Sequence, residues 1–308
     1  MQRFRFALVA GVILALSTLP AAAQTKLTVG SAGTAGAALF VAKHEGFFQK
    51  HGLDVNILMI KLNPDMPPAL VAGSLDVALM TTPTFFQAID GGLDLVAFVG
   101  GTPTSQARND QGVIARTDVP IKSAQDFIGR KVGVPGIGAG MHVLFRYWLD
   151  QRGVDFAQVN FVEVSLPQMR DALNAKLIDA VVAVDPFISQ MTNAGAGSMV
   201  VSLSHDIPPG KPVVIYVATR DWVEAHPKEV AAFRASILDG AAFAKAEPEK
   251  TKEDVNIYAK LPPAVMQTIA LTEQTPELEV EQLAWWFTLM KRQRMLTHDI
   301  DVSKLLVK

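Results

Sequence analysis

Two glycine-rich turns are the first places in this sequence where backbone groups could do chemistry. The stretch KVGVPGIGAGMHVL (Lys131 to Leu144) has the pattern of a short strand, a turn with alternate glycines and the start of a helix. Backbone N–H groups at such a turn can hold an anion or another polar ligand. The dinucleotide pattern GxGxxG fails because Met141 stands where the third glycine is needed, and GxxxxGK[ST] is absent. The turn therefore favours a small solute over a nucleotide, unless its glycines only permit the backbone geometry.

Familiar patterns of catalytic and metal chemistry are missing from the chain. The sequence has no cysteine, which removes disulfides, thiolate metal ligands and cysteine nucleophiles. Its six histidines show no HExxH spacing, and Gly30-Ser31-Ala32-Gly33 lacks the residue that GxSxG needs between glycine and serine. The net charge of −2 forms no basic stripe for nucleic acid. We therefore expect a protein that is not an enzyme, binds no nucleic acid and needs no cofactor or metal.

Residues 1–23 have the layout of a secretory signal peptide. Arg3 and Arg5 precede an apolar run that finishes in small residues, with cleavage expected after Ala23. The run is too short and too interrupted to favour a transmembrane helix. Because the chain has no cysteine for lipid attachment, we expect it to diffuse freely in the periplasm. We also expect it to be a monomer.

A duplication inside the chain shows how the turns are placed. Residues 26–55 have the pattern of strand, glycine-rich turn, helix and second strand, and residues 131–156 repeat that order. Further along, ALVAGSLDVALMTTPTF (Ala69 to Phe85) matches ALNAKLIDAVVAVDPFI (Ala172 to Ile188) at an offset of 103 residues. Two different elements that recur in the same order indicate two similar lobes.

Strands that alternate with helices predict an α/β fold with mostly parallel sheets flanked by helices. Ligands bind such sheets outside the carboxyl ends of the strands, which is where both glycine turns and the Thr-Pro and Asp-Pro corners fall. We expect residues 24–113 and 215–308 to form lobe 1 with C-terminal helices, and residues 114–214 to form lobe 2. Two crossings between the lobes then make a hinge. The Trp285-Trp286-Phe287 cluster is expected to pack against lobe 1.

Five stretches carry a family resemblance in this order: AKHEGFFQKHGLDV, GSLDVALMTTPT, DFIGRKVGV, ALNAKLIDAVVAVDPF and TRDWVEAHPKEV. Together they resemble the periplasmic substrate-binding proteins of ABC importers, in the branch that binds nitrate, sulfonates, taurine and thiamine-pyrimidine precursors. The resemblance implies a type II periplasmic-binding-protein architecture that closes over a small solute and delivers it to an inner-membrane permease. Enzymes of the wider fold group that make the thiamine pyrimidine use a cysteine-rich motif, which this chain lacks.

The candidate ligand-binding residues lie at the turns and corners of both lobes. Small side chains at the first turn leave backbone donors accessible, although Thr34 could simply cap the next helix. Thr82 and Asp185 precede prolines and could equally be helix caps, and Phe187 and Tyr216 could be core residues. The predicted contacts are Ser31, Ala32, Gly33, Thr34, Ala35, Asn63, Thr81, Thr82, Thr102, Gly138, Ala139, Gly140, Asp185, Phe187 and Tyr216.

The class of solute depends on few charged residues. Lys61, Arg108 and Arg146 are the basic candidates, and Arg108 could clamp a carboxylate or sulfonate. A free Asp185 oxygen would instead favour an amine or hydroxyl group. We expect a small sulfonate or carboxylate. The alternatives are a neutral heteroaromatic solute like a thiamine precursor, an exported enzyme of the same fold, or a protein that presents its ligand to a sensor rather than a permease.

Overall fold

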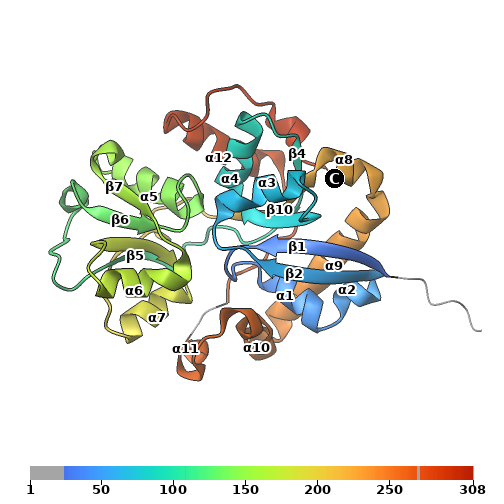
Figure 1. The fold of residues 1–308 in the computed structure, drawn as a ribbon, viewed down its shortest axis with the longest axis horizontal. Helices are drawn as coiled ribbons and strands as arrows, with labels where there is room; N and C mark the ends of the chain where they lie inside the picture. Colours follow the sequence, from blue (N-terminus) through green and yellow to red (C-terminus); the bar gives the residue numbers. More distant parts are fainter. Residues whose placement is uncertain (1–23, 108, 269–270, 308) are drawn as a thin grey trace, which may run out of the picture.

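The computed structural model describes residues 24–107, 109–268 and 271–307 and shows two α/β lobes side by side (Figure 1). The predicted signal peptide, residues 1–23, lies outside the described residues. The lobe 1 sheet has the order β2-β1-β3-β10-β4, and the lobe 2 sheet has the order β7-β6-β8-β5-β9. The strands are β1 (Thr25–Ser31), β2 (Leu53–Met59), β3 (Val77–Thr81), β4 (Leu95–Gly100), β5 (Gln111–Ala115), β6 (Lys131–Val134), β7 (Asn160–Glu163), β8 (Ala180–Val184), β9 (Ser198–Ser202) and β10 (Val214–Thr219).

Both sheets repeat one topology, which confirms the predicted fold class. β1 pairs in parallel with β2 and β3, and β6 pairs in parallel with β7 and β8. One antiparallel strand completes each set, β10 in lobe 1 and β5 in lobe 2. The third strand of each parallel set is a continuous apolar run, VALMT in β3 and AVVAV in β8. Such strands are buried on both faces, so each sheet needs helices on both sides.

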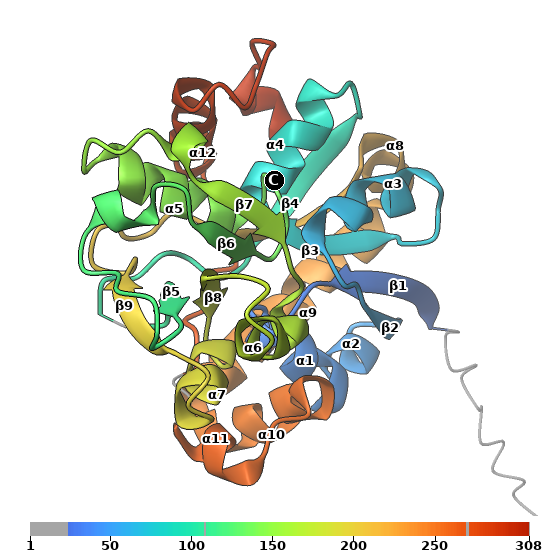
Figure 2. The same cartoon turned by 60° about the vertical axis from the view of Figure 1, so that its left-hand side comes forward.

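Helices pack on both faces of the sheets. Figure 2 shows α5 on one side of the lobe 2 sheet and α6 and α7 on the other. Prolines begin α9 and α10, where the missing N–H groups would have no partner in the helix. The helices are α1 (Ala37–His44), α2 (Phe47–Lys50), α3 (Met66–Val71), α4 (Thr82–Asp90), α5 (Gly140–Asp150), α6 (Met169–Asn174), α7 (Phe187–Asn193), α8 (Arg220–Ala225), α9 (Pro227–Ala246), α10 (Pro248–Ala259), α11 (Pro263–Thr268) and α12 (Val280–Arg292), with short 3-10 turns η1 (Asn63–Asp65), η2 (Ala124–Phe127), η3 (Phe156–Gln158), η4 (Leu166–Gln168) and η5 (Val302–Leu305).

Two antiparallel crossings connect the lobes. The first runs from β4 to β5 and the second from β9 to β10, and they meet at a bridge between Pro103 and Pro212. The Thr104 N–H donates to the Lys211 carbonyl at 2.8 Å beside that bridge. The predicted boundary after residue 113 falls inside β5, which is buried and pairs with β8 and β9 of lobe 2. Lobe 2 therefore begins before β5, a few residues earlier than the sequence suggested.

The C-terminal segment spans the junction of the lobes, with α12 at the top of Figure 1 and α10 and α11 at the bottom. Phe287 of α12 packs on Phe86 of α4, as predicted for lobe 1, and Trp286 is fully buried. Trp285 instead packs on Tyr147 of α5 in lobe 2. The segment thus contacts both lobes rather than lobe 1 alone.

Helix α10 holds a buried carboxyl group against α1. Asp254 is 2% exposed, and its Oδ2 has no hydrogen-bond partner among the described residues. Lys250 approaches Oδ1 to 3.8 Å but also lies 3.1 Å from Glu253 and 3.9 Å from Glu45. Burial, and then the negative charge of Glu45, raise the pKa of Asp254 to about 6. Folding therefore increases the neutral fraction of this carboxyl between about pH 4 and 6, and above pH 6 the charged form bears the cost of burial.

Replacing Asp254 with asparagine is expected to stabilise the protein above pH 6. A carboxyl pKa that is higher in the folded state makes stability fall as pH rises from about 4 through 6, and the asparagine side chain carries no such charge. Thermal unfolding at pH 8 should show the Asp254→Asn variant more stable by on the order of 1 kcal/mol, and the difference should vanish near pH 4. Glu249→Gln, at an exposed position of the same helix, is the control. Lower stability of Asp254→Asn at pH 8 with no difference near pH 4 would show that Lys250 compensates the burial of the charged form.

A candidate solute cleft between the lobes

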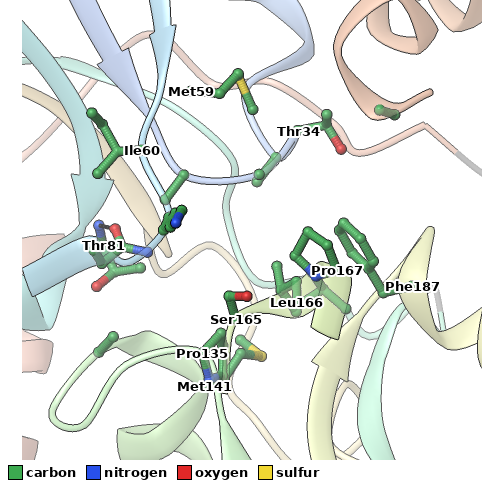
Figure 3. A pocket seen from close by; sticks show the side chains of 18 of the residues that line it. Thr34, Met59, Ile60, Thr81, Pro135, Met141, Ser165, Leu166, Pro167 and Phe187 are labelled. Carbon is green, nitrogen blue, oxygen red and sulfur yellow. Dashed lines mark hydrogen bonds between the residues drawn. The ribbon is translucent and has the colours of Figure 1, made fainter. Parts of the chain in front are cut away.

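A cavity of about 330 Å³ lies between the lobes and is lined from both of them. Figure 3 shows Thr34, Met59, Ile60 and Thr81 facing Pro135, Met141, Ser165, Leu166, Pro167 and Phe187 across it. The lobe 1 lining consists of Ala32, Gly33, Thr34, Ala35, Met59, Ile60, Lys61, Asn63 and Thr81, and the lobe 2 lining of Pro135, Ala139, Gly140, Met141, Ser165, Leu166, Pro167, Arg170, Val184, Phe187 and Gln190. Val213 and Val214 of the second crossing and Tyr258, Ala259 and Leu261 complete it. Its size suits a small organic molecule.

The glycine-rich turn of lobe 1 lines the cavity as predicted from position 32 to position 35. The carbonyl of Ala35 fixes the turn, because it accepts hydrogen bonds from the hydroxyls of Thr102 and Thr272 and from the Gln274 amide. Thr102 was predicted to contact the ligand, but it does not line the cavity, since its hydroxyl is used to hold the turn. Thr102 lies on the first crossing, so its hydrogen bond to Ala35 connects the glycine-rich turn of lobe 1 to the hinge.

Asn63 and Thr81 form a second polar corner of lobe 1, and both line the cavity. The Thr81 N–H donates to Asn63 Oδ1 at 3.0 Å, and Thr81 is the N-cap residue of α4. The sequence pattern predicted the N-cap at Thr82, which is one residue too late. Thr82 instead donates its hydroxyl to the Pro212 carbonyl, is fully buried and does not line the cavity.

The glycine-rich turn of lobe 2 has fewer accessible N–H groups than predicted. The Gly138 N–H donates to His142 Nδ1 at 2.8 Å, and the Gly140 N–H donates across the cleft to Thr81 Oγ1 at 3.2 Å. A Cβ on Gly138 would lie 2.4 Å from the terminal amide of Gln87 in lobe 1, and φ is +81° there, which favours glycine. Ala139 and Gly140 line the cavity, whereas Gly138 packs against the opposite lobe. The turn thus joins the two lobes directly.

Three other predicted contacts also lie outside the cavity lining. Ser31 is 1% exposed and donates its hydroxyl to the Gly33 carbonyl, and Tyr216 is fully buried in the lobe 1 core. Asp185 accepts from the Ser189 N–H and hydroxyl at the start of α7, and it faces a separate recess of about 30 Å³. Burial, and then Asp110, raise its pKa. Phe187 alone of the predicted residues after β8 lines the main cavity.

Arg170 and the loop before it are among the lining residues that the sequence did not predict. Ser165, Leu166 and Pro167 precede α6, and Arg170 lies in its first turn. The duplication contains a signal for them, because Pro167 lies 103 residues after Pro64, the same offset that relates the other repeated elements. The loop that begins α6 is therefore the counterpart of the loop that holds Asn63.

The charges that line the cavity are positive. Lys61 and Arg170 belong to the lining, one from each lobe, and none of its described residues is Asp or Glu. Arg170 has an ion pair with Asp171 at 3.3 Å, and its side chain is 41% exposed. Arg146 does not line the cavity, because it donates to the Gln293 carbonyl and stacks on Phe156. Arg108 lies outside the described residues.

A family model described as NMT1/THI5 like matches residues 34–251, which span both lobes. The chain belongs to this family. The match confirms the predicted resemblance. Within the part of this NMT1/THI5-like chain that the structure describes, no helix is long and apolar enough to cross a bilayer.

Individual relatives agree with the family match. A Brucella abortus (strain 2308) protein named as a candidate binding protein is 28% identical over 231 residues, covering 75% of this chain and 70% of the relative. The alkanesulfonate-binding protein SsuA of Xanthomonas axonopodis pv. citri, solved with MOPS bound, superposes with a TM-score of 0.78 at 18% identity, covering 93% of this chain and 99% of SsuA. The desulfurization enzyme DSZB has a TM-score of 0.65 at 15% identity, with 92% and 96% coverage. The fold is thus shared by binding proteins and at least one enzyme.

Proposed function

We propose that this protein is the periplasmic solute-binding component of an ABC import system. The family, the two-lobed fold and a cavity lined from both lobes support this proposal. A solute that contacts both lobes at once has a higher affinity for the closed form and shifts the population toward it. Closure changes the outer faces of the lobes, and a permease in the inner membrane recognises that change.

The solute that fits the cavity best is a small organic anion, a sulfonate or a carboxylate, with an apolar part. The observation that carries this choice is the pair Lys61 and Arg170, set in an otherwise mainly apolar lining without an acidic residue among those described. A guanidinium binds a carboxylate or sulfonate through two parallel hydrogen bonds. The apolar lining includes Leu166, Phe187 and Leu261, which a bare inorganic ion would leave without a partner.

The second candidate solute is a neutral heteroaromatic compound like a thiamine precursor. The aromatic rings of Phe187 and Tyr258 at the cavity favour it, because a flat ring can stack on them. An exported enzyme of this fold is the third candidate, and the likeness to DSZB is its support. The chain has no cysteine and so lacks the cysteine-rich motif expected of the enzymes that make the thiamine pyrimidine.

A thermal-shift screen distinguishes these candidates. A solute that binds only the folded state raises the melting temperature, so sulfonates and carboxylates should raise it and aminopyrimidines should not. Titration calorimetry then gives the stoichiometry, which we expect to be one solute per chain. A shift with aminopyrimidines alone would select the second candidate, and turnover of a solute during the incubation would select the third.

A further inference from the structure

One part of the cavity wall comes from the end of α10 rather than from the repeated elements of either lobe. Tyr258, Ala259 and Leu261 line the cavity there, and we call these three residues the α10 corner. They belong to the segment that follows the second crossing, which has no counterpart in the duplication. The corner can therefore differ between related chains without any change in the paired lobes.

Local hydrogen bonds and packing hold the α10 corner in place. Lys260 ends α10 in the left-handed conformation, with φ of 51°, which turns the chain back on itself. Asn256 then bonds both backbone groups of Leu261: its Oδ1 accepts from the Leu261 N–H at 2.8 Å, and its amide donates to the Leu261 carbonyl at 3.3 Å. The Tyr258 ring packs on Phe40 of α1 at 4.6 Å between centroids. The corner is thus fastened to lobe 1 as a fixed wall.

The corner lies at the end of the cavity that holds Thr34 and Phe187. A small recess beside the cavity is formed by Thr34, Asp185 and Pro186 together with Val255 of α10, and α11 packs against α7, which Phe187 begins. Figure 3 shows Thr34 and Phe187 on one side of the cavity and Ile60 and Thr81 on the other. Lys61 lies in the chain between Ile60 and Asn63, and Asn63 accepts the Thr81 N–H, so the backbone of Lys61 lies at the side of the cavity away from the corner.

We propose that the α10 corner limits the length of the apolar group on the solute, with Leu261 as the specificity-determining residue and Asn256 as a positioning residue. The inference rests on the proposed function, because it requires an anionic end bound at Lys61. With that end fixed, each added methylene extends toward the corner and gains about fourfold in affinity while apolar surface is still available. A chain that reaches Leu261 has no further room.

Titration calorimetry with unbranched alkanesulfonates, from methanesulfonate to octanesulfonate, tests the proposal. The parent protein should bind each longer chain about fourfold more tightly up to one length and more weakly beyond it. Leu261→Ala should move that optimum to a longer chain, and Leu261→Phe should move it to a shorter one. Asn256→Leu should flatten the optimum, whereas Asn256→Asp, which keeps the acceptor for the Leu261 N–H, should retain it.

A control variant and a stability measurement separate altered selectivity from general damage to the protein. Ile257→Ala, at an exposed position of α10 between these residues, should leave the length profile unchanged. Thermal unfolding of each variant separates loss of fold from altered selectivity. An unchanged optimum in both Leu261 variants, or an equal loss of affinity at every chain length, overturns the inference while the proposed function stands. Failure of every sulfonate and carboxylate to bind the parent protein overturns the anion assignment, and the inference with it.

Discussion

Replacing both Lys61 and Arg170 with methionine is expected to weaken the binding of a small organic sulfonate or carboxylate by about a hundredfold. A hydrogen bond to a charged group contributes about 1.5–3 kcal/mol, and each factor of ten in affinity corresponds to about 1.4 kcal/mol. Arg170 pairs with Asp171 and is partly exposed, and Lys61 is exposed, so the low end of that range applies to each cation. Titration calorimetry of the double variant against one sulfonate measures the loss.

Three controls make the result specific to the cleft. Lys61→Met and Arg170→Met alone should each lose about tenfold, and the two losses should add if the cations bind separate oxygen atoms. Lys122→Met with Lys228→Met removes two exposed charges outside the cavity lining and should leave the affinity within about twofold, measured at the same salt concentration. Equal losses in this outer pair would attribute the effect to the overall charge of the protein. Unchanged affinity in the double cleft variant would favour a neutral solute.

The duplication made the fold and the general position of the site predictable. Its two copies predict which strands are parallel, and parallel sheets place their binding loops at the carboxyl ends of the strands. That argument led to Asn63, Thr81 and Phe187, which line the cavity. The same offset of 103 residues would also have pointed to Pro167 and the start of α6, had the Asn63 loop been compared with its copy.

The predicted polar residues that do not line the cavity show why side-chain direction could not be predicted. The hydroxyls of Thr82 and Thr102 donate to carbonyl groups that lie far away in the sequence, on Pro212 and Ala35. Sequence shows that a hydroxyl follows a strand, but it does not show which distant carbonyl lacks a donor. Burial of Tyr216 likewise depends on the packing of β10 between β3 and β4, a pairing made after the chain returns from lobe 2.

The α10 corner was unpredictable for a different reason. Periodicity indicates that residues 248–259 form a helix, but the position of that helix depends on its packing against α1, and on a left-handed residue at Lys260 that is not a glycine. A left-handed lysine is uncommon and has no sequence signal of its own. Segments outside a repeat therefore need coordinates before a wall of the site can be assigned to them.

Replacing Thr81 with valine is expected to weaken solute binding by about tenfold, in addition to any loss of lobe 1 stability from the lost bond to Thr84. Thr81 Oγ1 accepts the Gly140 N–H across the cleft at 3.2 Å and lies 2.8 Å from the hydroxyl of Thr84. Valine has the same shape but no acceptor, so closure would leave the Gly140 N–H without a partner, at a cost of about 1–3 kcal/mol. In an open form water would solvate that N–H group. The penalty therefore falls on the closure equilibrium, and the apparent affinity falls with the fraction of closed protein.

Closure itself can be measured, because the chain has no native cysteine to interfere with labelling. Cysteines introduced at Ser74 and Leu177, exposed positions in lobe 1 and lobe 2, carry a fluorophore pair whose energy transfer reports the distance between the lobes. Thr81→Val should lower the closed fraction at a given solute concentration, and Thr81→Ser, which keeps the hydroxyl, should restore it. Thr81→Val could weaken binding without changing the closed fraction, either without solute or at saturating solute. In that case Thr81 acts on the solute directly. The bond to Gly140 would then be incidental, and the glycine turn of lobe 2 would only permit close packing of the lobes.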